Sequence, residues 1–258
     1  MIPDFRVGPF ILMYHAVGDY PDDPYSVSVD AFRQQVSWLS GNGFEVVSLA
    51  FLYRSIQLKN YGVLRKKVVI TFDDGYKDFI TNALPILCDH GATATVFLVT
   101  DMLGGRAAWN QSGPHVPLMS EDEICRIKAQ GISLGSHTAT HARLTLLNHQ
   151  ELQRQLRDSY DALTRLGESF YSISYPWGQW SGQVVDAVKA SGYECALAVG
   201  ELTRLTVADT YCLPRITMTR DMDLTRFQSF LTRTRVEMEI RRRYRILRET
   251  RSGAAATP

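Results

Sequence analysis

The chain has 258 residues, of which 45% are hydrophobic and 21% are charged, so it is long enough for one large domain with a substantial core or for two small ones. Its net charge is +1, but residues 233–251 hold eight Arg and three Glu, a local charge of +5 that leaves −4 for the rest. This balance excludes a basic, nucleic-acid-binding surface on the main body. No apolar run approaches the length of a membrane span, so no transmembrane helix is predicted.

The cysteines and the N-terminal sequence indicate the cellular compartment in which the protein is expected. The four cysteines, Cys88, Cys125, Cys195 and Cys212, have no C-x-x-C spacing, and we expect small buried side chains with reduced thiols. Reduced thiols favour a reducing compartment. The apolar stretch at residues 10–13 is too short for the core of a signal peptide. As written, the chain is expected to be cytoplasmic, and secreted only if a leader has been removed.

Taken in chain order, short apolar stretches that predict strands alternate with amphipathic stretches that predict helices. Strands are expected at residues 9–15, 44–48, 66–72, 93–99, 132–135, 171–175, 194–199 and 211–218. Helices are expected at residues 30–41, 49–56, 76–90, 120–131, 148–167 and 181–190, and from 223 onward. This alternation is typical of a parallel α/β fold, either a barrel or a doubly wound sheet. We find no linker or repeat, and predict a catalytic domain over residues 1–222 and a basic helix with a flexible tail over 223–258.

Several local signals set the helix starts and one long loop. Asp30 is the expected N-cap of the first long helix, and Ser120 with Glu123 has the spacing of a capping box. Asn148 and Glu151 open another helix. Residues 101–118 have no periodicity and contain three glycines, two prolines and Trp109. A long irregular stretch inside a compact domain is more often functional than idle.

Two adjacent carboxylates, Asp73 and Asp74, follow the β-branched run that ends at Phe72. A buried carboxylate is costly unless it is paired or bound to metal, so two in succession need an explanation. One explanation is a turn closed by Asp-Gly, with Asp74 capping the next helix. The other is a site at the end of the strand, where sites of parallel α/β folds form.

Two histidines follow another predicted strand, at His137 and His141. Two imidazoles four residues apart can converge on one cation, although such pairs are often solvated loop residues. Two histidines with one carboxylate make a three-ligand site with an open position, the layout of a hydrolytic metal rather than a structural one. The segment Tyr175-Pro176-Trp177-Gly178 ends a third strand, with a turn whose backbone N–H can point into a cavity.

These three segments resemble the first three motifs of the polysaccharide deacetylase family, the NodB-homology or carbohydrate esterase family 4 group. The motifs are Thr71–Gly75, His137-x-x-x-His141 after Gly135-Ser136, and Tyr175–Gly178, and the resemblance extends from about residue 9 to about residue 218. It implies a distorted (β/α) barrel, a divalent metal and hydrolysis of an N-acetyl group on a sugar. The metal would be Zn²⁺, with Co²⁺ and Ni²⁺ as alternatives.

The resemblance also implies a role for each matching residue. Asp74, His137 and His141 are similar to the metal ligands, and Asp73 to the general base. The backbone N–H of Trp177 would stabilise the oxyanion. Tyr175, Pro176 and Trp177 would line the substrate cleft, and we add Trp109 from the irregular loop to this group of substrate-contacting residues.

The sequence departs from the family pattern in two places. Many members place an arginine two residues before the third-motif proline, where this chain has Ser174, and we expect Arg215 either to supply that charge to Asp73 or to form a surface salt bridge. The C-terminal Leu-x-His motif is also missing. Tyr14-His15 at the first strand end resembles the family branch that deacetylates exopolysaccharides such as poly-N-acetylglucosamine, which makes His15 the expected general acid.

The sequence therefore predicts a carbohydrate N-deacetylase, whose substrate is an N-acetylated polysaccharide, oligosaccharide, or lipid- or nucleotide-linked saccharide. O-deacetylation, deformylation and weakly active carbohydrate binding are the alternatives. The basic stretch after residue 232 carries Val236, Ile240, Tyr244 and Leu247 at helical spacing. It is predicted to be a solvated helix packed on the barrel, and contact with an anionic membrane surface is an alternative. The sequence does not indicate an oligomeric state.

Overall fold

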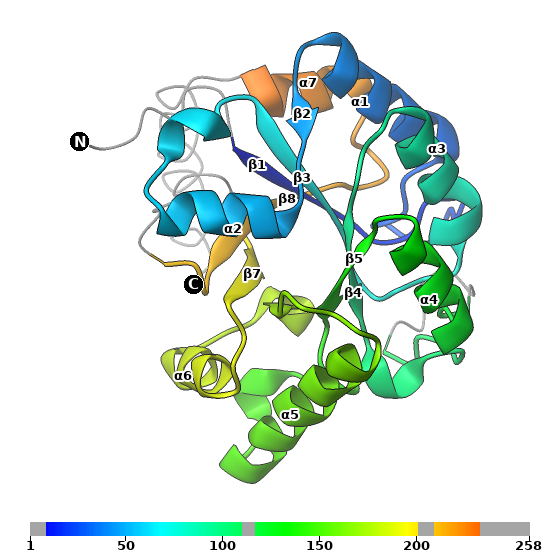
Figure 1. Ribbon diagram of the computed structural model, residues 1–258. Helices are drawn as coiled ribbons and strands as arrows, with labels where there is room; N and C mark the ends of the chain where they lie inside the picture. The colour runs from blue at the N-terminus through cyan, green and yellow to red at the C-terminus, as the bar shows by residue number, and fades with distance from the viewer. Residues whose placement is uncertain (1–8, 110–116, 201–208, 233–258) are drawn as a thin grey trace, which may run out of the picture.

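The computed structural model describes residues 9–109, 117–200 and 209–232, and these form a parallel β-barrel surrounded by helices (Figure 1). The strands are β1 (Phe10–Tyr14), β2 (Glu45–Val46), β3 (Lys67–Phe72), β4 (Thr95–Leu98), β5 (Ser133–Ser136), β6 (Ser172–Ser174), β7 (Cys195–Val199) and β8 (Leu213–Thr217). Their order is β1-β8-β7-β6-β5-β4-β3-β2, and β1 also pairs with β3. This last pairing closes the barrel and leaves β2 outside it, so the predicted distorted (β/α) barrel is confirmed.

The helices lie on the outside of the barrel (Figure 1). They are α1 (Val29–Gly41), α2 (Leu49–Gln57), α3 (Leu84–Asp89), α4 (Glu121–Ala129), α5 (His149–Arg165), α6 (Gly182–Ala190) and α7 (Leu224–Thr232). The predicted capping box of α4 is confirmed, and Asn148 and Glu151, predicted to open α5, also form a capping box. The prediction for α1 is wrong by two residues, because the side chain of Ser28, not Asp30, accepts the hydrogen bond from the N–H of Ala31.

The alternation of side chains along each strand determines what faces the inside of the barrel. In β3, Val68, Ile70 and Phe72 pack into the outer core with the helices, whereas Val69 packs into an inner core with residues of β1, β4, β7, β8 and α2. Thr71 and Asp73 continue the row that Val69 begins. The inside of the barrel is therefore apolar at the level of Val69 and polar where the strands end.

Two predictions about peripheral features need correction. Cys195 is buried and Cys212 is partly buried, but Cys88 and Cys125 are exposed, so these two cysteines do not act as core residues. The predicted helix over residues 76–90 begins as a π turn at Phe79–Ala83 and continues as α3, with Pro85 in its first turn, where proline costs no hydrogen bond.

The boundary predicted at residue 223 stays a prediction, but α7 packs against α1. Phe227 and Leu231 are buried in the outer core, and the ring of Phe227 meets Trp38 edge-on at 5.9 Å. The rest of the predicted basic helix and tail, residues 233–258, lies outside the described residues, as does the predicted membrane contact. Within the described ranges, no helix combines the length and apolarity needed to cross a bilayer.

Candidate active site

The chemically active residues predicted from the sequence gather in one cavity of about 390 Å³ at the carboxyl ends of the strands. The cavity is lined by Met13, His15, Asp23, Pro24, Tyr25, Asp73, Asp74, Trp109, His137, His141, Tyr175, Trp177, Gly178, Val199 and Thr217. These residues come from the ends of β1, β3, β5, β6, β7 and β8, from the loop between β1 and α1, and from the loop that carries Trp109. The parallel strand order brings together segments that are far apart in the sequence.

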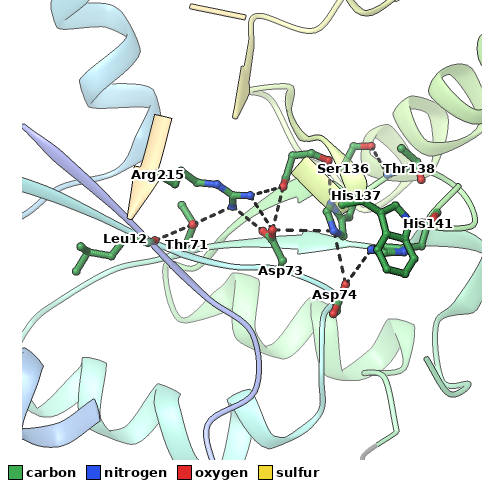
Figure 2. Close-up of polar contacts among 11 residues, drawn as sticks. Leu12, Thr71, Asp73, Asp74, Ser136, His137, Thr138, His141 and Arg215 are labelled. Atoms are coloured by element: carbon green, nitrogen blue, oxygen red, sulfur yellow. Dashed lines mark hydrogen bonds and ion pairs between the residues drawn. The ribbon is translucent and has the colours of Figure 1, made fainter. Parts of the chain in front are cut away.

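Asp73 is clamped by Arg215 inside the barrel (Figure 2). Nη1 of Arg215 lies 2.7 Å from Oδ1 of Asp73, and Nη2 lies 2.7 Å from Oδ2. Both residues are buried, with exposed fractions of 1% for Arg215 and 2% for Asp73. A bidentate guanidinium–carboxylate pair is among the strongest hydrogen-bonded pairs in proteins. The pair that the sequence analysis considered is therefore present as a buried clamp, not as a surface salt bridge.

Two hydroxyl groups complete this clamp. Oγ of Ser174 donates to Oδ2 of Asp73 at 3.0 Å and accepts from Nη2 of Arg215 at 2.7 Å. Oγ1 of Thr71 accepts from Nη1 of Arg215 at 3.2 Å and donates to the carbonyl oxygen of Leu12 at 2.8 Å. Burial raises the pKa of Asp73, but the charge and hydrogen bonds of Arg215 outweigh it, so the pKa lies well below its ordinary value. Asp73 is thus ionised at neutral pH.

Asp74 lies beside the same pair but faces the two histidines (Figure 2). Its Oδ1 is 3.5 Å from Nε2 of His137 and 3.5 Å from Nε2 of His141, and this oxygen has no hydrogen bond within the described residues. Nδ1 of His137 lies 2.8 Å from the carbonyl oxygen of Ser174. Because a neutral imidazole carries one proton, that contact assigns it to Nδ1 and leaves a lone pair on Nε2.

Burial keeps both imidazoles neutral. It lowers the pKa of His137 to about 4 and that of His141 to about 2. Burial and the neighbouring charge of Asp73 raise the pKa of Asp74 to about 8. Lone-pair atoms of Asp74, His137 and His141 that could bind an ion all lie within 4.8 Å of one another. Electron-rich atoms held this close in a buried site repel one another unless a proton or a cation lies among them, and two imidazoles with one carboxylate are a ligand set that fits a divalent metal ion.

The backbone is strained where it presents these side chains. Four non-glycine residues of the site region adopt positive φ: Asp74 at 73°, Thr138 at 68°, His141 at 59° and Trp177 at 62°. Such residues are uncommon and gather at functional sites. The N–H of Thr138 donates to Oγ of Ser136 at 3.0 Å, which holds the turn between the two histidines (Figure 2). Gly135 before this turn has no room for a side chain, since a Cβ there would lie 2.4 Å from the Phe97 ring.

A family model described as polysaccharide deacetylase matches residues 61–196, more than half of the chain. The chain belongs to the polysaccharide deacetylase family.

Individual relatives agree with this assignment. YxkH of Bacillus subtilis, named as a member of the polysaccharide deacetylases, is 27% identical over 223 residues, which are 86% of this chain and 75% of YxkH. The poly-β-1,6-N-acetyl-D-glucosamine N-deacetylase of Staphylococcus aureus is 26% identical over 209 residues, 76% of this chain and 69% of that enzyme.

Solved structures show the same fold. The deacetylase PplD of Streptococcus pyogenes, solved in complex with acetate, has a TM-score of 0.75 and 24% identity, covering 86% of this chain and 97% of PplD. IcaB from Ammonifex degensii has a TM-score of 0.74 and 20% identity, covering 88% and 98% of the two chains. At these identities the matches establish the shared barrel.

On the side of β1, the deacetylase cavity is bounded by His15. Its ring lies 5.1 Å from that of Tyr25, and its Nδ1 is buried without a hydrogen bond within the described residues. Burial lowers the pKa of His15, and the charge of Asp73 opposes this effect. The structure therefore places the predicted acid in the cavity as a neutral imidazole. Its role in proton transfer stays a prediction.

The predicted substrate-contacting residues differ in what they offer to the cavity. Trp109 stacks on His141, with ring centroids 4.5 Å apart, and Trp177 is 44% exposed and donates from Nε1 to the carbonyl oxygen of His141 at 3.3 Å. The hydroxyl group of Tyr175 donates to the carbonyl oxygen of Tyr211 at 2.9 Å, so it is committed to the fold rather than free for substrate. Pro176 is buried in the turn before Trp177.

Three residues of this region had no role predicted from the sequence: Thr71, Arg143 and Asp23. Thr71 shares a strand face with Asp73 at a spacing of two residues, a signal that was available in the sequence. Arg143 lies over the ring of Trp177 at 4.0 Å, and Asp23 lines the cavity; neither has a local signal. Ser174 was noted only as the place where an arginine was missing. Its hydroxyl group binds both members of the clamp.

Proposed function

We propose that this polysaccharide deacetylase removes N-acetyl groups from a saccharide built of N-acetylated amino sugars. One observation carries the proposal: a single cavity holds an ionised, clamped carboxylate next to an Asp-His-His cluster that fits a divalent cation. Hydrolysis of an amide needs a proton acceptor for water and stabilisation of the oxyanion, and this pair of features supplies both. The named substrate of the Staphylococcus aureus relative supports an N-acetylglucosamine polymer.

Asp73 is the proton acceptor in this proposal. Its carboxylate is held in one orientation by Arg215 and Ser174, and its pKa is too low for it to keep a proton. Asp73 therefore takes the proton from water only while the amide is attacked, and passes it on. In this proposal that proton goes to His15, a neutral imidazole at the β1 side of the cavity, which then donates it to the departing amine.

Asp74, His137 and His141 hold the divalent cation. Two imidazoles and one carboxylate suit Zn²⁺, which when bound would supply Lewis-acid activation of water and of the amide carbonyl. The hydrogen bond from Nδ1 of His137 to the carbonyl oxygen of Ser174 fixes the ring that offers Nε2. The backbone N–H of Trp177, at the turn that ends β6, is the proposed donor to the oxyanion.

Acetate release is the direct test. The wild-type enzyme, loaded with Zn²⁺, is assayed with poly-β-1,6-N-acetylglucosamine, chitin-type oligomers, nucleotide sugars and lipid-linked saccharides. Asp73→Asn keeps the size of the side chain but not its basicity. We expect it to lower kcat by about 10²–10⁴-fold while the metal content per chain stays that of the wild type.

Two outcomes would contradict the proposal. Release of acetate at the wild-type rate by Asp73→Asn would show that Asp73 is not the proton acceptor. Release of formate, or of ester-linked acetyl groups only, would assign the enzyme to deformylation or O-deacetylation instead.

A further inference from the structure

The connection between β1 and α1 forms a closed loop over residues 16–27. The N–H of Gly18 donates to the carbonyl oxygen of Val27 at 2.9 Å, and the N–H of Val27 donates to that of Ala16 at 3.0 Å. Val17 and Val27 also form a parallel bridge. The two ends of the loop are therefore hydrogen-bonded to each other, so that residues 19–26 between them form a single closed segment.

Two other parts of the fold hold this loop from outside. The N–H of Val17 donates to Oδ2 of Asp78 at 3.0 Å, and Nδ2 of Asn82 donates to the carbonyl oxygen of Val17 at 2.7 Å. After β8, the N–H of Arg220 donates to the carbonyl oxygen of Pro24 at 2.9 Å. With its base and its tip both fixed, the loop presents its side chains to the cavity in a set geometry, as recognition requires.

Asp23 is the charged residue that this loop brings to the cavity. It is only 2% exposed, and it lines the cavity next to Pro24 and Tyr25. Its Oδ1 accepts the N–H of Tyr25 at 3.0 Å, and Oγ of Ser26 donates to its carbonyl oxygen at 2.9 Å. Across the described ranges, no lysine, arginine or histidine forms an ion pair with Asp23, although burial lowers the pKa of the nearby His15 and the charge of Asp23 opposes this effect. The N–H of Tyr25 is the donor that the described residues supply to its carboxylate.

Asp23 therefore differs from the other buried carboxylates of the cavity. Asp73 has the clamp of Arg215, and Asp74 has the two histidines. Asp23 lines the cavity and takes only one hydrogen bond from the described residues on its carboxylate, so a further donor can come from whatever enters the cavity. Sugars offer hydroxyl donors on every ring. A carboxylate that is oriented by one backbone N–H and lines the cavity is suited to accept from such a group.

Building on the proposed function, we propose that Asp23 recognises the sugar, accepting a hydrogen bond from a hydroxyl group of the unit that loses its acetyl group. The residue acts in binding and not in proton transfer. Its contribution depends on the sugar and not on the acetyl group. A substrate with the acetyl group but without the sugar would not engage it.

The test compares Asp23→Asn with Asp22→Asn, an exposed aspartate next to it in the chain. Asparagine can still accept the N–H of Tyr25, but it turns the second oxygen into a donor. We expect Asp23→Asn to lower kcat/KM for an N-acetylglucosamine oligomer about tenfold or more, mainly through KM. The loss on an activated aryl acetate should be smaller by about tenfold. Asp22→Asn should match the wild type on both substrates.

Binding gives a second readout that does not need turnover. In the Asp73→Asn background, calorimetry with the same oligomer should show a Kd that rises about tenfold when Asp23→Asn is added. If Asp23→Asn fails to fold by circular dichroism, Asp23→Glu, which displaces the charge by one methylene, replaces it with the same expectation.

Equal losses of kcat/KM on the oligomer and the aryl acetate would overturn the role of Asp23 alone. The same conclusion would follow if Asp23→Asn left the Kd of the Asp73→Asn protein unchanged while the wild-type enzyme releases acetate. A wild-type enzyme that neither binds nor deacetylates any saccharide would overturn the proposed function as well.

Discussion

Asp73 and Asp74 are neighbours at one strand end and both are buried, yet their surroundings are opposite. Asp73 has a guanidinium group on both oxygens, and its pKa lies below its ordinary value. Asp74 has two imidazole nitrogens at 3.5 Å from Oδ1, and burial raises its pKa to about 8. The left-handed backbone of Asp74 ends the strand alternation, so the two side chains meet different partners.

The difference between Asp73 and Asp74 shows that the protein balances the charge of Asp73 with its own residues. The clamp around Asp73 balances the carboxylate charge within the protein, because the guanidinium group and two hydroxyl groups bind it and one another. The group around Asp74 is incomplete without a cation. A third buried carboxylate, Asp78, has neither arrangement: it accepts the N–H of Val17, and burial raises its pKa to about 7. The three aspartates thus differ in surroundings: Asp73 is paired with an arginine, Asp74 lies in a cluster that fits a metal ion, and burial favours the protonated form of Asp78.

Breaking the Asp74-His137-His141 cluster should have the largest effect on activity. Asp74→Asn replaces an anionic ligand with a neutral one, and we expect bound metal to fall from about one ion per chain to near zero, with acetate release lost in parallel. Metal content is measured by atomic emission after gel filtration. Asp101→Asn, on an exposed aspartate, is the control and should keep its metal. Full metal retention in Asp74→Asn would remove this residue from the ligand set.

Weakening the clamp of Arg215 on Asp73 should have the next largest effect on activity. Arg215→Lys keeps the charge but loses the fork that binds both oxygens of Asp73. We expect kcat to fall up to about 10²-fold because the carboxylate is no longer held in place. Weaker pairing also raises the pKa of Asp73, so the acid limb of the kcat/KM profile should move to higher pH.

The control for this change is Arg220→Lys, five residues further on, whose partner Asp19 is exposed. It should leave both kcat and the pH profile as they are in the wild type. An acid limb that does not move in Arg215→Lys would mean that the clamp does not set the protonation of the catalytic carboxylate.

Much of the barrel and of the site could be predicted, because both depend on local patterns. The alternation of apolar runs and amphipathic stretches indicates a parallel α/β fold, and the ends of its strands carry Asp73, Asp74, His137 and His141. The partner of Asp73 was harder, because Arg215 is 142 residues away and reaches it only through the pairing of β1 with both β3 and β8. The family pattern, with its missing arginine, was what pointed to it.

Other features depend on tertiary contacts that no local pattern encodes. The exposure of Cys88 and Cys125 follows from which side of a helix packs on the barrel, and short helices leave that side ambiguous. Asp23 reaches the cavity only because a loop closes through Val17 and Val27. The positive φ of Asp74 and His141 is tolerated because the surrounding fold imposes it.

A smaller effect should come from the hydroxyl group inside the clamp. Ser174→Ala removes a donor to Asp73 and an acceptor for Arg215, but leaves the two guanidinium hydrogen bonds. We expect a loss of about 1–3 kcal/mol in the free energy of unfolding and less than about tenfold in kcat. Ser172→Ala on the same strand is the matched control, because Oγ of Ser172 is buried without a hydrogen bond within the described residues. Urea unfolding of both variants measures the difference, and equal stabilities would show that Ser174 adds nothing to the clamp.

Substitution of Asp78 should give the smallest effect, which is visible only in how the stability of the protein depends on pH. Burial raises the folded-state pKa of Asp78 to about 7, against about 3.9 for an unfolded aspartate, so the folded chain holds a proton between these values. Its stabilising contribution is complete below about pH 4 and is lost as the pH rises through 7. Asp78→Asn cannot titrate but can still accept the N–H of Val17, so with Zn²⁺ present its Tm should fall less between pH 5 and pH 8, by a few degrees. The exposed Asp186→Asn should follow the wild type. Identical pH dependences for all three proteins would mean that Asp78 is ionised in the fold, and that its charge is balanced by a partner rather than by a proton.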